Sequence, residues 1–295
     1  SLPTVIGEKI VLRILDRASV IVDIKRLGFA EKNLAVYKKL YSQSYGMILV
    51  TGPTGSGKTT TLYSTLTGLN KPTKNIITVE DPTEYRLDGI NQVQVNAKAG
   101  LTFAAGLRSI LRQDPNIIMV GEIRDGETAD IAIRAALTGH LVLSTLHTND
   151  SIGAVSRLVD MGVEPFLVAS SVLGILAQRL VRKICPECKE SYVLETDSPE
   201  RAFFGEHYQD GTTLYRGAGC PSCANTGYRG RMAIHEVFPI SKGLRELITE
   251  KASGEKLKAL AAQEGMTTMQ YDGFQKVLAG ETTINEIMRV AYAEL

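Results

Sequence analysis

The sequence of 295 residues contains no Trp, and Phe and Tyr bring its aromatic content to only 6%. Proteins that bind single-stranded nucleic acid use aromatic side chains on which bases stack, so this composition argues against such a surface. The charges also nearly cancel, because 33 Lys and Arg residues face 32 Asp and Glu residues and leave a net charge of +1. Dedicated nucleic-acid-binding domains usually carry a basic excess, so we expect no nucleic-acid partner.

Long apolar runs are absent as well. The longest uncharged run near the middle of the chain, residues 166–178, contains Ser170, Ser171 and Gly174. A membrane-spanning helix needs about 20 predominantly apolar residues, so we expect no direct membrane span. We also expect no signal peptide, and the first residue is Ser1 rather than Met. We therefore expect the chain to be a fragment or a processed form of a longer protein.

Hydrophobic residues make up 44% of the chain and charged residues 22%, which is typical of a folded globular protein of about two domains. Between residues 45 and 150, short apolar runs alternate with helical segments. The first of these helical segments is predicted at residues 58–69. The runs are residues 47–50, 75–79, 117–120 and 141–144. Because they are continuous rather than alternating, we predict an α/β fold with a mainly parallel sheet covered on both faces.

The remaining segments give weaker signals. Residues 8–15 predict a strand, and residues 34–41 predict a helix. Residues 151–183 and 241–295 both favour helices. Between them, residues 185–231 are rich in Cys, Gly, Pro and Tyr, which indicates a separate small unit.

A glycine-rich segment, residues 52–59, fits the pattern G-x-x-x-x-G-K-[ST] at every fixed position. Its glycines let backbone N–H groups turn toward phosphate oxygens, and the N-terminus of the following helix adds a positive dipole end. Lys58 would contact the β and γ phosphates of a nucleotide, and Thr59 would offer its hydroxyl to Mg²⁺. The predicted nucleotide-binding residues of this loop are Gly52, Pro53, Thr54, Gly55, Ser56, Gly57, Lys58, Thr59 and Thr60.

Acidic residues follow two of the predicted strands. Glu80, Asp81 and Glu84 come after the second strand, and Glu122 follows the third. Open parallel sheets bind ligands at the carboxyl ends of their strands, so these carboxylates are predicted to lie near the phosphate loop. Glu122 would hold Mg²⁺ together with Thr59, and Glu84 would activate the attacking water, although these two roles could be exchanged. Glu80 and Asp81 are assigned to cofactor binding; a solvated loop or a helix cap is the alternative for either cluster.

Two histidines lie at opposite ends of the fourth predicted strand. His147 closes it at the same sheet edge as the phosphate loop, so it is predicted to sense the γ-phosphate or to relay a hydrogen bond. A surface or capping residue is the alternative. His140 lies at the other end and is expected to be structural.

Three arginines flank the second acidic strand. Arg108 and Arg112 are separated by four residues and share one face of a helix, and Arg124 follows Glu122. Arginines directed at a phosphate site would neutralise charge in the transition state. The alternative is ordinary ion pairing with Glu122 or Asp125.

All four cysteines fall in one pattern of two C-x-x-C pairs, with 31 residues between the pairs. Cys185, Cys188, Cys220 and Cys223 offer four thiolates that can close a tetrahedral Zn²⁺ site, as in a zinc ribbon. Such a site leaves no open coordination position, so its role would be structural. Two disulfides and a redox C-x-x-C are the alternatives. Disulfides are disfavoured because the protein is expected in a reducing compartment. A redox site is disfavoured because it needs one C-x-x-C pair, and this sequence has two.

Together these motifs resemble those of the secretion ATPase superfamily, and within it most closely the type IV pilus assembly and type II secretion ATPases. Residues 52–59, 78–84, 121–125 and 144–149 resemble its Walker A, Asp box, Walker B and His box, in that order. The similarity runs nearly without interruption from about residue 3 to residue 295. The resemblance implies a RecA-like P-loop NTPase core, a small four-cysteine zinc subdomain and a helical C-terminal region, with ATP, Mg²⁺ and Zn²⁺ as ligands.

The resemblance also implies a domain division and an assembly. Residues 1–33 would be the remnant and linker of an N-terminal, PAS-like domain, residues 34–183 the ATPase core, residues 184–236 the metal-binding subdomain and residues 237–295 the C-terminal helical region. Family members form a homo-hexamer in which the N-terminal domain packs on the core of the next subunit. Arg13 matches a family arginine that approaches the nucleotide.

The function implied by the resemblance is a motor ATPase that powers the extraction and assembly of pilin or pseudopilin subunits at the inner membrane. Type IV pilus assembly is the favoured role, and type II protein secretion is the alternative. The implied partners are an inner-membrane platform protein and a cytoplasmic recruiting protein, and the implied location is the cytoplasmic face of that membrane. Two other classes stay open: a RecA-like nucleic-acid motor, and a nucleotide-binding scaffold without hydrolysis.

Overall fold

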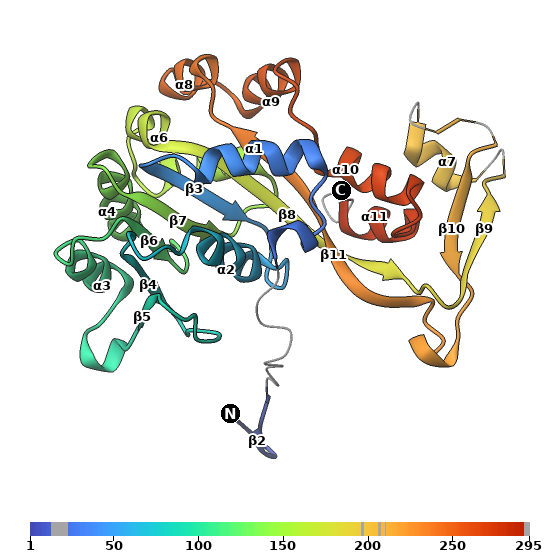
Figure 1. Cartoon of the computed structure of the whole chain (residues 1–295), viewed down its shortest axis with the longest axis horizontal. Helices are drawn as coiled ribbons and strands as arrows, with labels where there is room; N and C mark the ends of the chain where they lie inside the picture. Colours follow the sequence, from blue (N-terminus) through green and yellow to red (C-terminus); the bar gives the residue numbers. More distant parts are fainter. Residues whose placement is uncertain (13–22, 196–197, 206–207, 210, 292–295) are drawn as a thin grey trace.

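The computed structural model describes residues 1–12, 23–195, 198–205, 208–209 and 211–291. Within these residues a large sheet carries helices on both faces, and a smaller unit lies to one side of it (Figure 1). The strands are β1 (Leu2–Thr4), β2 (Gly7–Lys9), β3 (Gly46–Thr51), β4 (Ile76–Glu80), β5 (Asn91–Gln94), β6 (Ile117–Val120), β7 (Leu141–Leu146), β8 (Val172–Ile184), β9 (Lys189–Val193), β10 (Thr213–Gly217) and β11 (Tyr228–Pro239).

The α-helices are α1 (Glu31–Tyr41), α2 (Lys58–Leu69), α3 (Phe103–Ile110), α4 (Gly126–Leu137), α5 (Ser151–Asp160), α6 (Pro165–Ser171), α7 (Pro199–Phe204), α8 (Lys242–Thr249), α9 (Gly254–Gln263), α10 (Met269–Leu278) and α11 (Ile284–Ala291). Short 3₁₀ turns are η2 (Ile24–Arg26), η3 (Ala97–Ala99) and η5 (Pro221–Cys223). None of the helices in the described part of the chain is long and apolar enough to cross a membrane.

The large sheet has the strand order β11-β8-β3-β7-β6-β4-β5. The pairings from β8 to β5 are parallel, and only β11 runs antiparallel, beside β8. Every residue of β3, β4, β6 and β7 is buried, as the continuous apolar runs of these strands require. The prediction of an α/β fold with a mainly parallel sheet is confirmed.

Two apolar cores cover the faces of this sheet. On one face, α1 and α2 pack Tyr37, Leu62 and Leu66 against β3, β6 and β7. On the other face, α3 to α6, together with α8 and α9 from later in the sequence, bury a larger core that includes Leu107 and Ala132. The helices therefore hold the sheet from both sides, and the carboxyl ends of its strands remain available for a site.

The expectation that residues 151–183 are all helical is wrong. Helices α5 and α6 end by Ser171, and Val172–Ile184 forms the longest strand of the sheet. This apolar segment pairs with β3 on one edge and β11 on the other, so neighbouring strands decide its structure rather than its local pattern. At Gly174 a Cβ atom would lie 2.5 Å from Leu40 Cδ1, which shows how closely the strand passes α1.

The expected strand at residues 8–15 is shorter than predicted. Strand β2 ends at Lys9 and pairs with β1 in a hairpin, and residues 10–12 are not in a strand. The rest of that segment, with Arg13, lies outside the described residues. Helix α1 starts at Glu31, three residues before the predicted start, and the predicted helices after residue 241 are present as α8 to α11.

The far ends of β8 and β11 carry a third core with α7, β10, α10 and α11, which includes Phe204, Leu214 and Phe274. Helix α11 is joined to β8 through Glu286, whose side chain is 2% exposed. Its carboxylate accepts hydrogen bonds from the backbone N of Arg182, at 2.9 Å, and from its Nη2, at 2.7 Å. Arg289 Nη2 adds a third bond at 2.9 Å. Although burial raises the pKa of Glu286, the bonds from Arg289 and Arg182 outweigh it and lower this pKa to about 2.

We predict that Glu286→Gln destabilises the chain in a pH-dependent way. Because the pKa of Glu286 is lowered on folding, its contribution is complete above its ordinary value of 4.5 and is lost as the pH falls through about 2. The free energy of unfolding at pH 7 should fall by about 2 kcal/mol, since the two arginines lose a buried partner. Denaturant unfolding between pH 7 and pH 2 measures both effects.

The control for this prediction is Glu190→Gln, which removes an exposed ion pair with Arg216 and should change stability little. A Glu286→Gln difference that grows on acidification would contradict the assigned role of the carboxylate.

Candidate functional site

The phosphate loop connects β3 to α2 at the carboxyl edge of the sheet, and its glycines adopt backbone conformations that favour glycine. Gly52, Gly55 and Gly57 have φ of +147°, +82° and +88°. A Cβ atom on Gly55 would meet nothing within 4 Å, so the loop leaves open space beside this residue. Gly57 is the N-cap of α2, which is 12 residues long. Consecutive N–H groups in such a turn, followed by a helix N-terminus, form an anion-binding concavity.

Lys58 lies over this loop. Its Nζ donates to the carbonyl oxygens of Gly52, at 2.7 Å, and Pro53, at 3.0 Å. Burial lowers the pKa of Lys58, the carboxylate of Glu122 opposes this, and the charge of Arg179 lowers it further. The ammonium group therefore lies within electrostatic reach of Glu122, the acidic residue that the sequence placed after the third strand.

Glu122 joins two other predicted site residues. Its Oε1 accepts from Arg124 Nη2 at 2.5 Å, and its Oε2 lies 3.5 Å from His147 Nε2. The loop that carries Glu122 is held to β7, because Thr145 Oγ1 donates to the oxygen of Gly121 at 2.7 Å. The side chain is 14% exposed, so the carboxylate is accessible but not freely solvated.

The surroundings of His147 favour its uncharged form. Partial burial lowers its pKa below the ordinary 6.5, and the positive charge of Lys58 lowers it further, whereas Glu122 opposes both. A neutral imidazole can donate a hydrogen bond through one ring nitrogen and accept one through the other. The residue can therefore relay a hydrogen bond beside Glu122, which is one of the roles predicted from the sequence.

The segment after His147 is fixed to the strand that leads into the phosphate loop. Thr51, the last residue of β3, places its Oγ1 2.5 Å from Thr148 Oγ1 and accepts from Thr148 N at 3.0 Å. Two residues later, the Asp150 carboxylate caps α5 by accepting from Gly153 N at 2.6 Å. The geometry of His147 is thus coupled to the end of β3.

The carboxylates of the first acidic cluster, Glu80, Asp81 and Glu84, have different surroundings. The Glu80 carboxylate is 3% exposed and accepts hydrogen bonds from Tyr63, Thr78 and Gln92, so these contacts direct it toward α2 and β5. Burial raises the pKa of Tyr63, and its hydrogen bond to Glu80 raises it further, whereas the backbone of Glu84 opposes this. The backbone of Glu84 therefore lies near the hydroxyl of Tyr63, which is five residues after Lys58 on α2.

The other predicted residues lie farther from these contacts. Asp81 is exposed. The pKa of Arg124 is raised mainly by its hydrogen bond to Glu122 and also by the charge of Asp81, so Asp81 lies near the Arg124–Glu122 pair. Arg108 is exposed and pairs with Glu127 at 2.5 Å, and Arg112 is also exposed. His140 Nδ1 lies 3.0 Å from the oxygen of Ala135 at the end of α4, as expected of a structural residue. Arg13 lies outside the described residues.

Sequence reasoning missed two residues of this site, Gln178 and Arg179. Both lie on β8, in a segment that was expected to be helical, so no sheet-edge argument applied to them. Gln178 Nε2 donates to the oxygen of Ser56 in the phosphate loop at 2.7 Å. Arg179 Nη2 donates to the oxygen of Asn149 at 2.8 Å, and its charge acts on Lys58.

The four cysteines form a cluster where β8 ends and β11 begins. Their sulfur atoms all lie within 4.8 Å of one another. The Sγ atoms of Cys185 and Cys220 are 3.8 Å apart, those of Cys188 and Cys223 are 3.9 Å apart, and those of Cys220 and Cys223 are 3.6 Å apart. A tetrahedral zinc site with Zn–S distances of about 2.3 Å has sulfur–sulfur distances of about 3.8 Å. The donor set therefore fits Zn²⁺, and all four thiols are free rather than paired in disulfides.

Backbone N–H groups surround these sulfur atoms. Gly219 N donates to Cys188 Sγ at 3.3 Å, and Cys220 N and Gly227 N donate to Cys223 Sγ at 3.2 and 3.3 Å. Such bonds stabilise thiolates, the form that binds metal. The turns also pack closely, since a Cβ atom at Gly217 would lie 2.0 Å from the oxygen of Gly227. The cluster thus joins the β9–β10 hairpin to the ends of β8 and β11.

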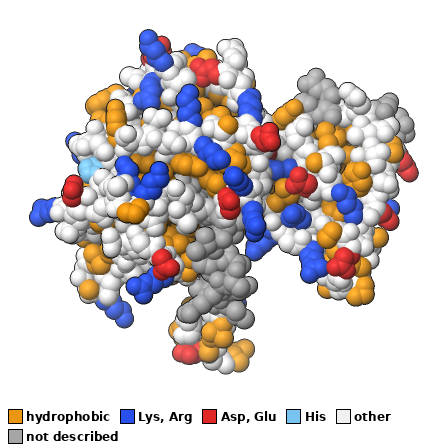
Figure 2. Space-filling view, viewed as in Figure 1, with side chains coloured by type: hydrophobic (Ala, Val, Ile, Leu, Met, Phe, Trp, Pro, Cys, Tyr) orange, Lys and Arg blue, Asp and Glu red, His pale blue; other side chains and the backbone are white. Residues whose placement is uncertain are grey.

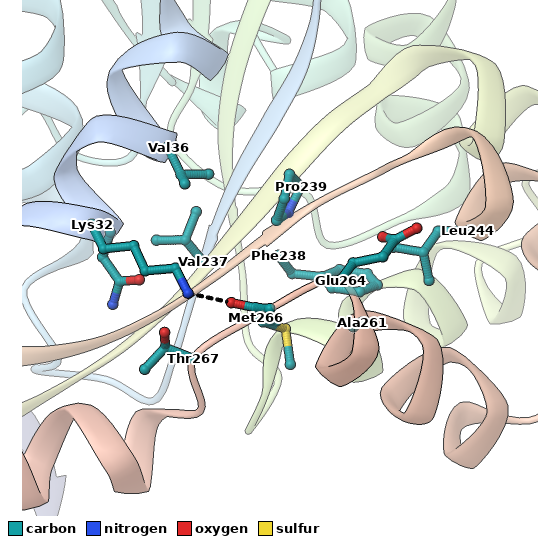
Figure 3. A pocket seen from close by; sticks show the side chains of 12 residues that line it. Lys32, Val36, Val237, Phe238, Pro239, Leu244, Ala261, Glu264, Met266 and Thr267 are labelled. Atoms are coloured by element: carbon teal, nitrogen blue, oxygen red, sulfur yellow. Dashed lines mark hydrogen bonds between the residues drawn. The ribbon is translucent and has the colours of Figure 1, made fainter.

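A cavity of about 90 Å³ lies between α1, β11 and α9, and none of the predicted site residues lines it (Figure 3). Its wall is mostly apolar, with Val36, Val237 and Met266 among the residues that face it. Lys32 Nζ donates to the oxygen of Gly265 at 2.7 Å across one side, which ties α1 to the C-terminal helical region. The cavity is distinct from the sheet edge that holds Lys58.

The model of the family described as type II/IV secretion system protein matches residues 1–289. The chain is 52% identical over 294 residues to type II secretion system protein E of Pseudomonas aeruginosa, which covers all of this chain and 58% of that protein. It is also 52% identical over 294 residues to the type IV pilus assembly ATPase PilB of Myxococcus xanthus, with 97% of this chain and 51% of that protein covered. The chain thus spans little more than half the length of these relatives.

Solved structures agree with the fold. The crystal structure of the pilus retraction motor PilT with bound ADP has a TM-score of 0.68 and 32% identity, and covers 92% of this chain and 67% of that chain. The ATPase DotB of Legionella pneumophila has a TM-score of 0.67 at 22% identity, which is similarity of fold alone, over 92% of this chain and 66% of that chain.

We predict that the purified chain carries one Zn²⁺ and that Cys188→Ser removes it. Residues 185–231 should loosen in this variant, because the metal would join the turns at both ends of this segment and so supply folding free energy. Nucleotide binding should survive, since none of the predicted nucleotide residues lies between residues 185 and 223. Elemental analysis and nucleotide titration on the same preparation measure both effects.

The control is Ser222→Ala, which changes an exposed residue between Cys220 and Cys223 and should retain the metal. Metal-free protein obtained without chelator, with both C-x-x-C pairs oxidised to disulfides, would overturn the zinc assignment.

Proposed function

The chain belongs to the type II/IV secretion system protein family, and on this premise we propose that it is the motor portion of an ATPase that hydrolyses ATP to power secretion or pilus assembly. Relatives at 52% identity include both a type II secretion protein E and a type IV pilus assembly ATPase, so the proposal is for the ATPase activity common to the two machines.

The observation that carries the proposal is the meeting of three groups at one sheet edge. Lys58, Glu122 and His147 follow three adjacent strands, β3, β6 and β7, and they interact with one another through charge and hydrogen bonding. A cation at a phosphate loop, a carboxylate and a neutral hydrogen-bonding group are what the hydrolysis of a nucleoside triphosphate requires. A scaffold that binds nucleotide without hydrolysis would not need the hydrogen-bonding group beside the carboxylate.

The residues of the phosphate loop would bind ATP. The N–H groups of residues 54–60 and the dipole of α2 would contact the phosphates, and Lys58 would exchange its bonds to Gly52 and Pro53 for phosphate oxygens. The open space beside Gly55 fits this binding mode. His147 would donate from Nε2 to the Glu122 carboxylate and accept at Nδ1 from a water beside the terminal phosphate, and Arg124 would orient the Glu122 carboxylate.

Thr59 and Glu122 would hold Mg²⁺, which when bound neutralises negative charge on the phosphates. Glu84 would accept a proton from the attacking water. This order of roles is supported by the interaction of Glu122 with Lys58, whereas Glu84 lies beside Tyr63. Glu80 and Asp81 stay predicted cofactor-binding residues, with Glu80 acting through Tyr63 of α2.

Assembly as a homo-hexamer is part of the proposal. The exposed arginines Arg108 and Arg112 would then be available to the nucleotide of a neighbouring subunit, as would Arg13, whereas Arg124 would act in its own site through Glu122. The hairpin of β1 and β2 has exposed apolar side chains, including Val5 and Ile6, and contact with another chain would cover them. Hydrophobic side chains lie exposed at the lower end of the molecule in Figure 2, where Figure 1 places this hairpin. The zinc subdomain would be structural. A platform protein of the inner membrane and a cytoplasmic recruiting protein would be the partners, which would place the enzyme at the cytoplasmic face of that membrane.

We predict that Lys58→Ala reduces ATPase activity to below about a tenth of the wild-type rate, because the phosphates lose their cation. Zinc content should stay unchanged. Phosphate release by the purified chain is the measurement, and Lys71→Ala, an exposed lysine after α2, is the control. A Lys58→Ala enzyme that keeps more activity than this would remove Lys58 from the mechanism.

We further predict that Glu84→Gln and Glu122→Gln each bind ATP but fail to hydrolyse it. Loss of Glu122 should also weaken the dependence of ATP binding on Mg²⁺, whereas loss of Glu84 should not, because only Glu122 is assigned to the metal. ATP titration at several Mg²⁺ concentrations, combined with phosphate release, separates the two roles. Normal turnover in Glu84→Gln would exclude Glu84 as the base, and the opposite Mg²⁺ pattern would exchange the roles.

A further inference from the structure

Strand β8 places Gln178 against the start of the phosphate loop. The parallel pairing of β8 with β3 ends with Thr51 opposite Ala177, so the next residues, Gly52 and Gln178, are neighbours where the loop begins. The Gln178 side chain is buried, with 1% of the residue exposed. We infer that Gln178 is a positioning residue for nucleotide binding, because its amide fixes the orientation of the loop. This inference rests on the proposed nucleotide-binding function.

The amide of Gln178 connects two parts of the nucleotide site. Its Nε2 donates to the oxygen of Ser56 in the loop at 2.7 Å. Its Oε1 accepts from Thr61 Oγ1 in α2 at 2.9 Å. Thr61 N also donates to the oxygen of Gly57 at 3.1 Å, within the first turn of the helix. One side chain from a neighbouring strand thus holds both the loop and the helix that follows it.

The bond to Ser56 determines which way the next N–H group points. A trans peptide is planar, and its C=O and N–H groups point in opposite directions. Because Gln178 holds the Ser56 oxygen toward β8, the N–H of Gly57 is directed away from β8. N–H groups of a phosphate loop act as an anion cradle only when they are turned to the same side. Without this bond, the Ser56–Gly57 peptide could rotate, and ordering it would reduce nucleotide affinity.

Gln178 also explains two glycines of the phosphate-loop motif. A Cβ atom at Gly52 would lie 2.5 Å from the backbone oxygen of Gln178, and a Cβ atom at Gly57 would lie 3.2 Å from its Nε2. Any larger residue at Gly52 would therefore clash with β8, independently of a nucleotide. These glycines allow the loop to approach the strand closely enough for the amide to reach Ser56.

An amide suits this position because it offers a donor and an acceptor. A glutamate is only an acceptor when ionised, so it would face the Ser56 carbonyl with a like partial charge. A methionine has similar length but makes neither bond. Loss of the bridge leaves a buried carbonyl and a buried hydroxyl unsatisfied, so Gln178→Met should affect stability as well as binding. The test must separate these effects.

Gln178→Met is therefore compared with Thr282→Val. Thr282 is also fully buried, and its Oγ1 donates at 2.8 Å to the oxygen of Arg182, four residues further along β8. Both variants remove a buried side-chain bond at the same strand and should lower the free energy of unfolding. Only Gln178→Met should weaken ADP binding, by about tenfold, as measured by ADP titration of the purified chain.

A second pair of variants tests the other end of the bridge. Thr61→Val removes the hydroxyl without changing the shape of the side chain, whereas Thr61→Ser keeps it. We expect Thr61→Val to weaken ADP binding and Thr61→Ser to retain the wild-type affinity for ADP. The double variant Gln178→Met with Thr61→Val should bind ADP about as weakly as Gln178→Met alone, since the two groups act as one unit.

The outcomes distinguish this inference from the proposed function. A wild-type chain that binds neither ADP nor ATP would refute the proposed function itself. Wild-type binding with unchanged ADP affinity in both Gln178→Met and Thr61→Val would overturn the positioning role alone. Equal loss of ADP affinity in Thr282→Val and Gln178→Met would reduce Gln178 to a contributor to stability. Loss in Gln178→Met and Thr61→Val, with retention in Thr282→Val and Thr61→Ser, supports the inference.

Discussion

Strand β3 is hydrogen-bonded on both edges, to β7 and to β8, and the geometry of the whole nucleotide site depends on these two parallel pairings. The pairing with β7 brings Thr148 to Thr51 and so sets the position of His147. The pairing with β8 brings Gln178 to the phosphate loop. A loop of glycines has little intrinsic preference for one conformation, and neighbouring strands supply the contacts that select it. The site is therefore a property of the sheet rather than of the motif alone.

The sequence predicted the parts of the fold in which local pattern and tertiary environment agree. Helix α2 begins at Lys58 and ends at Leu69 as expected, and β6 occupies the predicted Ile117–Val120. Buried parallel strands must be continuously apolar, so their pattern is readable before any contact is known. The same reasoning placed Glu122 and His147 at one sheet edge, where the structure brings them together. The spacing of the two C-x-x-C pairs likewise predicted a cluster of four thiols.

One wrong prediction of secondary structure also hid part of the site. The segment from Val172 to Ile184 is apolar enough for a buried helix or a buried strand, and only its pairing with β3 and β11 decides between them. Missing this strand also hid Gln178 and Arg179, because no argument about sheet edges could be applied to a supposed helix. Glu80 illustrates a different limit: the sequence places it at the end of a strand, but only the structure shows its hydrogen bonds with Tyr63 and Gln92 from other elements.

The continuity of β8 restricts how the length of this chain can vary. In 13 residues the strand pairs with β3, supplies Gln178 to the phosphate loop, holds Glu286 of α11 through Arg182 and leads into Cys185. Successive side chains of a strand point to opposite faces, so inserting or deleting one residue between Gln178 and Cys185 would turn one end of the strand over relative to the other. The thiol cluster and the amide bridge could not then both form. Relatives that keep both features should therefore keep a gap-free alignment across this strand, while the exposed turns around it can change length.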